Sequence, residues 1–126
     1  MPLQNINPTT TKAWKKLASH FSEMDTFSLK EAFKSSQNRK ENFSIVFNDL
    51  MLDFSKNKVE QKTIDLLVEL ANEVELKDAI DKYFSGEVIN VTEDRAVLHT
   101  ALRSNSDEEL LIDTKDIRPD IKKALR

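Results

Sequence analysis

The chain has 126 residues and a formal net charge of -3, enough for one domain with one modest core. Its nearly balanced charges create no broad positive field, so a nucleic-acid partner is not expected. The chain contains no cysteine, which excludes disulfides and thiolate chemistry. No apolar run has the length of a signal peptide or of a membrane span, and we expect a soluble, cytoplasmic protein without a membrane partner.

Phosphate-cradling loops and histidine metal sites are also excluded by composition. The only glycine is Gly86, so the chain cannot form the glycine-rich loop that wraps a backbone around a phosphate or a dinucleotide. His20 and His99 lie far apart and lack the spacing of metal ligands. We therefore predict neither a P-loop or Rossmann nucleotide site nor a histidine-based metal site.

Two helices are expected near the N-terminus. In TTTKAWKKLASHF, apolar residues recur at helical spacing, which predicts an inward stripe of Trp14, Leu17, Ala18 and Phe21. Ser28 stands three residues before Glu31, the spacing of a capping box, and predicts a second, short helix with Leu29, Ala32 and Phe33 inward. The polar run over residues 35–42 is expected to end it.

A β-hairpin is predicted over residues 43–54. Apolar residues alternate with other residues on both sides of the turn-prone pair Asn48-Asp49. A lone hairpin is marginal in water, so we expect this one to pack on the helices or to join a sheet outside the segment. The aromatic set of Trp14, Phe43, Phe47 and Phe54 is expected to be core rather than a platform for stacking bases.

Helical spacing returns over residues 59–75 and again over 75–86, where Gly86 is placed to cap the helix end. The expected inward residues of these helices are Ile64, Leu67, Val68, Ala71, Leu76, Ala79, Ile80 and Phe84. Short extended pieces are predicted over Val88–Val91 and Leu110–Asp113. Pro119 suits the first turn of a last helix, whose apolar stripe ends with the chain after about two turns, and we expect it to continue in a longer protein.

The segment TEDRAVLHTALR offers the one candidate site. Thr92 is a favoured helix N-cap, and a helix starting there would align Arg95, His99 and Arg103 along one flank. Such a strip could grip a phosphate while His99 moves a proton. It could equally pair with acidic groups across a domain or subunit contact. We favour the structural interpretation by roughly four to one, because no nucleophile or second base accompanies the strip.

Acidic clusters at Glu73/Glu75 and Asp107–Glu109 are expected to be solvated surface rather than catalytic carboxylates. The candidate site list for this chain is therefore empty: we predict no catalytic, substrate-binding or metal-binding residue within it.

Three phrases carry a family resemblance: MLDFSKN (51–57), YFSGEVINVTEDRAVLHTALR (83–103) and LLIDTKDIRPDIKKAL (110–125). Their wording, order and spacing closely resemble the N-terminal portion of the glucose-6-phosphate isomerase family, also called phosphoglucose isomerase. The resemblance is specific from Phe43 onward and weak before it.

The resemblance implies a cytosolic, homodimeric enzyme of glycolysis and gluconeogenesis that interconverts glucose 6-phosphate and fructose 6-phosphate without a cofactor. In the family, a glutamate moves the proton through an enediol, a histidine and a lysine assist, and a loop of serine and threonine holds the phosphate. All these groups follow the point that matches Arg126, so none is carried over to this chain, and His99 is not the family's catalytic histidine.

We accordingly expect an α+β, mainly helical segment over 1–126, whose small hairpin and apolar stripes pack on the α/β sugar-isomerase domains of a full-length enzyme. The segment should end before or at the start of the first of those domains. Alone it should be inactive and marginally stable, with exposed apolar stripes. The alternative is an independent acidic helical interaction module.

Overall fold

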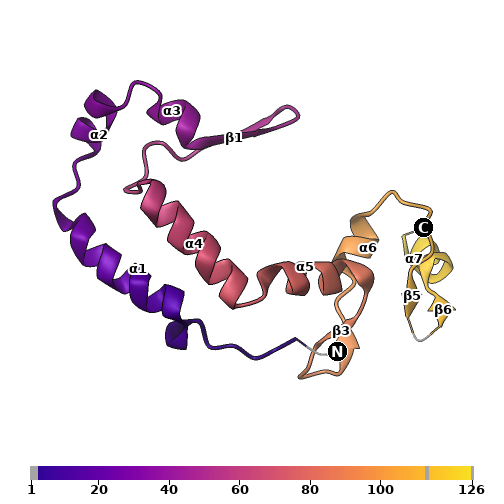
Figure 1. Ribbon diagram of the computed structural model, residues 1–126. Coiled ribbons are helices and arrows are strands. Elements are labelled where there is room, and N and C mark those ends of the chain that lie inside the picture. The colour runs from indigo at the N-terminus through magenta and orange to yellow at the C-terminus, as the bar shows by residue number, and fades with distance from the viewer. Residues whose placement is uncertain (1–2, 113, 126) are drawn as a thin grey trace. The chain divides into compact units, whose positions relative to one another are not determined.

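A computed structural model of the chain describes residues 3–112 and 114–125 (Figure 1). The architecture is mainly helical with three small antiparallel strand pairs among these residues, so the predicted α+β class is confirmed. Two compact units are present, one over 7–70 and the other over the described parts of 1–6 and 71–126. Each unit is described by itself.

In the first unit, the turn η1 (Pro8–Thr10) leads into α1 (Lys12–Glu23), where the Thr11 side chain accepts a hydrogen bond from the Trp14 N–H. The turn η2 (Met24–Thr26) and α2 (Leu29–Ser35) follow, and the Ser28 side chain caps α2 by accepting from the Glu31 N–H. The start predicted for this helix is thus confirmed. A further short helix, α3 (Arg39–Asn42), lies in the run that was expected only to end α2.

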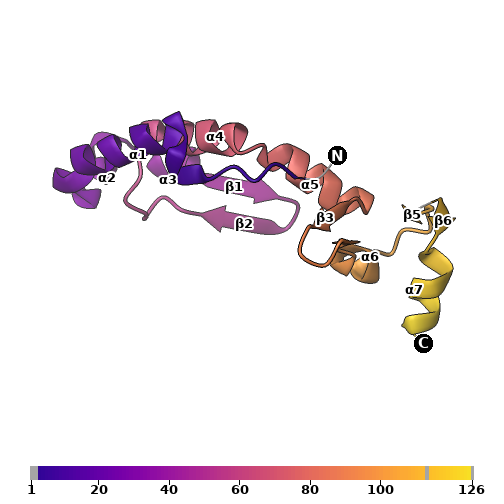
Figure 2. The same cartoon turned by 90° about the horizontal axis from the view of Figure 1, so that it is seen from below.

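The predicted hairpin is confirmed, with β1 (Ser44–Phe47) and β2 (Leu50–Asp53) joined at Asn48-Asp49. Asn48 takes a left-handed φ of 54°, a conformation that Asn tolerates better than most residues. The hairpin extends away from α3 (Figure 1), and its two strands lie side by side (Figure 2). Helix α4 (Gln61–Glu73) follows it.

In the second unit, α5 (Leu76–Ser85) ends at Gly86, whose φ of 78° provides the predicted left-handed cap. The strands β3 (Val88–Asn90) and β4 (Arg95–Ala96) pair, α6 (His99–Arg103) follows, and β5 (Leu111–Ile112) pairs with β6 (Lys115–Asp116). The last helix, α7 (Arg118–Ala124), has its proline in the first turn, as predicted. Of the strand predicted over Leu110–Asp113, Asp113 lies outside the described residues.

The predicted helical stripes exist but are poorly covered. On α1 the buried residues are Ala13 and His20, whereas Trp14 is 42% exposed and Phe21 81%. On α4 the buried residue is Leu66, while the predicted inward pair Leu67 and Val68 is exposed.

The aromatic core prediction is likewise wrong in part, since only Phe43 of the set is buried and Phe47 is 73% exposed. The physical reason is that a helix or hairpin face needs a second layer to bury it, and the described residues do not supply that layer. Exposed apolar stripes were the expectation for a segment of a larger protein.

Candidate functional site

The candidate strip is not a helix along its whole length, so the prediction of one helix from Thr92 to Arg103 is wrong. Arg95 lies in β4, and α6 begins only at His99. The Thr92 hydroxyl does not cap a helix but donates to the Asn90 side chain at 2.7 Å. The same Asn90 oxygen also accepts from the backbone N–H of Glu93, three residues later, and the chain closes as a β-turn instead.

Arg95 is paired with a neighbouring carboxylate. Its Nε and Nη2 both donate to the Glu93 carboxylate at 2.5 Å, and its side chain is 68% exposed. An exposed pair of this kind contributes little stability. The pair nevertheless engages Nε and Nη2, one of the edges with which a guanidinium can bind a phosphate.

Arg95 and His99 line one hollow of about 520 Å³, but Arg103 is not among its described lining residues. The described residues around this hollow are Asn90, Arg95, Ala96, Val97, Leu98, His99, Leu102 and Ile112. None of them is a carboxylate, a hydroxyl or an amine. General acid–base isomerisation needs a base beside the substrate carbon. The imidazole of His99 could serve as one, but no second base and no nucleophile accompany it among the described lining residues.

A buried arginine is the feature of the chain that the sequence analysis missed. Arg39, on α3, is 4% exposed. It donates to three backbone carbonyls after the hairpin, those of Ser55 at 2.9 Å, Asn57 at 3.1 Å and Val59 at 2.9 Å. The planar fork of a guanidinium can serve several acceptors at once, and here it fixes the loop that connects β2 to α4.

Aromatic rings surround the same guanidinium. Its carbon lies 4.5 Å from the ring centre of Phe43 and 5.6 Å from those of Phe27 and Phe33, within cation–π range. The sequence contained one usable signal, since Arg39 and Phe43 stand four residues apart. That spacing places two side chains on the same face of a helix.

Ser55 and Asp53 complete this loop. Ser55 is 1% exposed, and its N–H donates to the Asp53 carboxylate at 2.9 Å. The hydrogen bonds from the Ser55 side chain and backbone hold the pKa of Asp53 below its ordinary value, so this carboxylate stays charged near neutral pH. The motif MLDFSKN thus folds as the end of β2 and the tightly bonded loop that follows it, which is a structural use of its polar residues.

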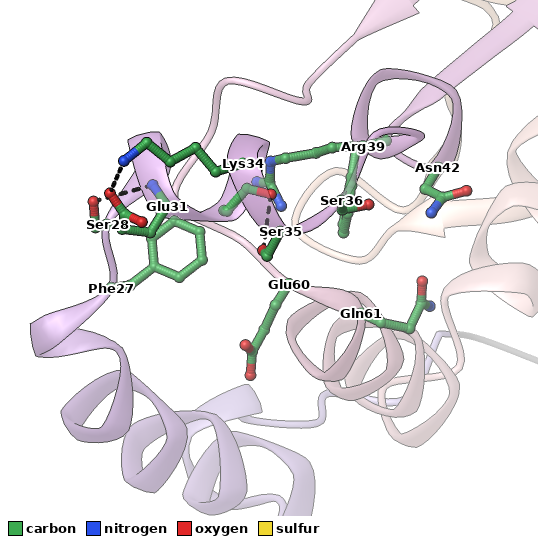
Figure 3. Close-up of a pocket in the computed structure, with 12 residues that line it drawn as sticks. Phe27, Ser28, Glu31, Lys34, Ser35, Ser36, Arg39, Asn42, Glu60 and Gln61 are labelled. Atoms are coloured by element: carbon green, nitrogen blue, oxygen red, sulfur yellow. Dashed lines mark hydrogen bonds and ion pairs between the residues drawn. The ribbon is translucent and has the colours of Figure 1, made fainter.

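A hollow of about 670 Å³ borders α2 and α3 (Figure 3). Its cations are already engaged: Lys34 pairs with Glu31 at 2.9 Å, and Arg39 donates to the three carbonyls described above. Glu60 adds a further negative charge to the lining. A phosphate would meet carboxylates here without an available guanidinium, so the hollow does not suit an anionic substrate.

His20 is a satisfied buried histidine. It is 2% exposed, and its Nε2 lies 2.8 Å from the Thr63 hydroxyl while its Nδ1 lies 3.3 Å from the Glu23 carboxylate. The Thr63 oxygen also accepts from the Glu60 N–H at 3.2 Å. The ring therefore links α1 to the first turn of α4, and both of its nitrogens have partners.

The acidic clusters behave as surface groups. Asp107 to Glu109 and Glu75 are exposed, and Glu73 is half-buried. Hydrogen bonding and charge from Lys122, 2.6 Å away, hold the pKa of Asp107 below its ordinary value. Within residues 3–112 and 114–125, acidic and histidine side chains form no group that could hold a metal ion, and no helix is long and apolar enough to cross a membrane.

The described residues form a mainly helical segment with small strand pairs, and comparison with known proteins assigns the chain to a class. A model of the phosphoglucose isomerase family matches residues 53–126, which is more than half of the chain, and the chain belongs to that family.

A curated relative, the glucose-6-phosphate isomerase of Christiangramia forsetii, is 47% identical over 119 residues. The match covers 94% of this chain but only 22% of the relative. The chain therefore spans about a fifth of the length of the curated relative that it matches.

Proposed function

We propose that this chain is part of a glucose-6-phosphate isomerase, which interconverts glucose 6-phosphate and fructose 6-phosphate by aldose–ketose isomerisation through an enediol. The observation that carries the proposal is the 47% identity to a curated enzyme of that name across 94% of the chain. The family match over residues 53–126 supports the same assignment. Nothing comparable favours an independent interaction module.

Within that enzyme, the segment over 1–126 is proposed to be the N-terminal part, preceding the first α/β sugar-isomerase domain. Its role is that of a helical buttress. The exposed apolar residues of α1 and α4 support this role, because contiguous exposed apolar surface in a protein usually marks a binding surface. The match covers only 22% of the relative, and the rest of the enzyme is proposed to supply the surface on which these residues pack.

The proposal places the catalytic and substrate-binding groups outside this chain. Arg95 is paired with Glu93, the described lining of the hollow that includes His99 offers no second base, and the cations of the hollow in Figure 3 are engaged. The enzyme is further proposed to be cytoplasmic, homodimeric and cofactor-free, acting in glycolysis and gluconeogenesis. Its partner is a sugar phosphate, not a nucleic acid or a membrane.

The test is an isomerase assay of two proteins, the 126-residue chain and the full-length polypeptide that contains it. Formation of glucose 6-phosphate from fructose 6-phosphate is followed by a coupled dehydrogenase reaction. We expect turnover by the full-length protein and none by the chain alone. Turnover by the chain alone, or a full-length protein that folds but does not isomerise either sugar phosphate, contradicts the proposal.

A pair of variants of the full-length protein tests whether the candidate strip is structural. Arg95→Ala and Arg103→Ala should both leave kcat within about twofold of the unmodified enzyme, because the proposal gives both arginines a structural role and none in a transition state. A large fall in kcat for Arg95→Ala alone, with an unchanged melting temperature, would instead place Arg95 in the catalytic machinery.

A further inference from the structure

The two faces of the β1–β2 hairpin differ in chemistry. In an antiparallel pair, residues directly opposite each other share one face. Ile45 lies opposite Leu52, and Phe47 lies opposite Leu50. Because these pairs are two residues apart along each strand, all four side chains point to the same side. We call this set the apolar face.

The opposite side is only half apolar. It holds Val46 opposite Met51 near the turn and Ser44 opposite Asp53 near the base. We call this set the mixed face. Since the pKa of Asp53 is lowered by its hydrogen bonds to Ser55, the mixed face keeps a charge near neutral pH. A charged group resists transfer into an apolar contact, so the two faces suit different environments.

The apolar face is left open. Its four side chains are exposed by 58% for Ile45, 73% for Phe47, 66% for Leu50 and 57% for Leu52. The contiguous exposure of four large apolar residues is unusual, whereas single exposed apolar residues are ordinary.

The hairpin is also fixed at its base rather than loosely attached. The Phe54 N–H donates to the Phe43 carbonyl at 2.9 Å, and the two rings meet edge to face with centres 5.9 Å apart. Arg39 packs on the Phe43 ring and donates to the Ser55 carbonyl. The buried anchor therefore sets the direction in which the exposed half of the hairpin extends, which lowers the entropy lost when that half binds a surface.

We propose that the apolar face docks against the remainder of the isomerase polypeptide, on an apolar surface that lies beyond this chain. The proposal rests on the proposed function. The match covers 22% of the relative, and the remaining 78% of such an enzyme is taken as the source of that surface. It adds which side of the hairpin is covered: the apolar face is buried, and the mixed face remains toward solvent.

The chain contains no cysteine, which allows a direct test with single-cysteine variants. Leu50→Cys reports the apolar face, and Met51→Cys, the next residue, is a matched control on the mixed face. Any cysteine elsewhere in the full-length polypeptide is replaced by serine. The rate of labelling by a water-soluble maleimide is measured for both variants, in the 126-residue chain and in the full-length protein, and Phe47→Cys with Val46→Cys repeats the comparison.

In the 126-residue chain both positions are expected to label at rates within about threefold of each other, since Leu50 and Met51 are 66% and 49% exposed. In the full-length protein, labelling of Leu50→Cys should slow by about tenfold or more, because a covered thiol reacts only through local opening. Met51→Cys should keep its rate. Equal rates at the two positions in the full-length protein, whether fast or slow, overturn the proposal.

Protection of Leu50→Cys in the 126-residue chain alone also overturns the proposal. If that protection rises with protein concentration, a second copy of the chain covers the apolar face. If it does not, the chain's own residues cover it. Isomerase activity is assayed in the same full-length samples. Inactive protein with selective protection of Leu50→Cys would refute the proposed function while leaving the docking face standing. Active full-length protein with equal labelling at the two positions would support the proposed function and refute the docking of the apolar face.

Discussion

Replacing Arg39 by methionine tests the central packing feature of the first unit. Methionine keeps most of the side chain's length and apolar contact but removes every donor of the guanidinium. The carbonyl of Ser55, at 2.9 Å in a buried position, then loses its hydrogen bond. The carbonyls of Asn57 and Val59 are only partly buried and can turn to water.

The expected cost follows from these contacts. A hydrogen bond from a charged donor to a buried acceptor contributes about 1.5–3 kcal/mol. Two acceptors that regain water add about 0.5 kcal/mol each. Loss of cation–π contacts with the surrounding rings adds roughly 1 kcal/mol, part of which methionine recovers through its sulfur. Relief of the buried charge acts in the opposite direction, so we expect a net loss of about 2–4 kcal/mol for Arg39→Met.

The measurement is urea unfolding followed by the fluorescence of Trp14, the single tryptophan, which lies in the same unit as Arg39. Arg39→Lys keeps the charge but cannot reach three carbonyls with one ammonium, and should lose about half as much. Arg103→Met, at an exposed position, serves as a control and should change stability by less than about 0.5 kcal/mol.

An Arg39→Met chain that is as stable as the unmodified chain, or more stable, would refute this reasoning. That outcome would mean that relief of the buried charge outweighs the loss of the carbonyl contacts. An equal loss in Arg39→Met and Arg103→Met would show that the three carbonyl contacts contribute nothing specific.

Three further predictions concern single contacts. Thr63→Val removes the hydroxyl beside His20 Nε2 and should lower the free energy of unfolding by about 1–2 kcal/mol. Thr63→Ser keeps the hydroxyl and should retain most of that stability. Equal losses for the two variants in urea titrations would argue against a contribution from this hydrogen bond. Gly86→Ala forces a side chain onto a φ of 78° and brings its Cβ to 2.6 Å from Ile112 Cδ1, so a loss of about 1–2 kcal/mol is expected, and an unchanged urea midpoint would contradict it. Two backbone N–H groups hold the pKa of Asp116 below its ordinary 3.8, so its contribution to stability is fully present above pH 3.8 and is lost as the pH falls through the lowered folded-state value. Asp116→Asn should therefore flatten the acid side of a melting-temperature profile, and a profile that keeps its slope would show that other carboxylates set it.

Elements whose signals lie in neighbouring residues were predictable. Ser28 caps α2, Gly86 ends α5, and Pro119 lies in the first turn of α7, each a signal that acts within a few residues. The hairpin register was also readable, because the turn at Asn48-Asp49 and the alternation agree. Where local signals agree in this way, the sequence alone is sufficient to predict the element and its ends.

Features that depend on competition or on distant partners were not predictable. The Thr92 hydroxyl can cap a helix or donate to Asn90, and its own neighbourhood does not decide which; pairing of β3 with β4 does. Arg39 looked like part of a polar loop because its carbonyl partners lie 16 to 20 residues later. A helical pattern predicts which side chains share a face, but the described residues do not cover the faces of α1 and α4, so the pattern could not predict which of these side chains remain exposed.

The hairpin has one more consequence, which concerns the outer edge of each strand. Among the described residues β1 and β2 pair only with each other, so each strand presents a row of backbone donors and acceptors to any extended chain that approaches. Together with the exposed apolar face, these unpaired edges form a template for intermolecular strand addition. The 126-residue chain alone should therefore aggregate at high concentration with a gain of β-structure. A charged replacement such as Phe47→Lys should delay the onset of this aggregation.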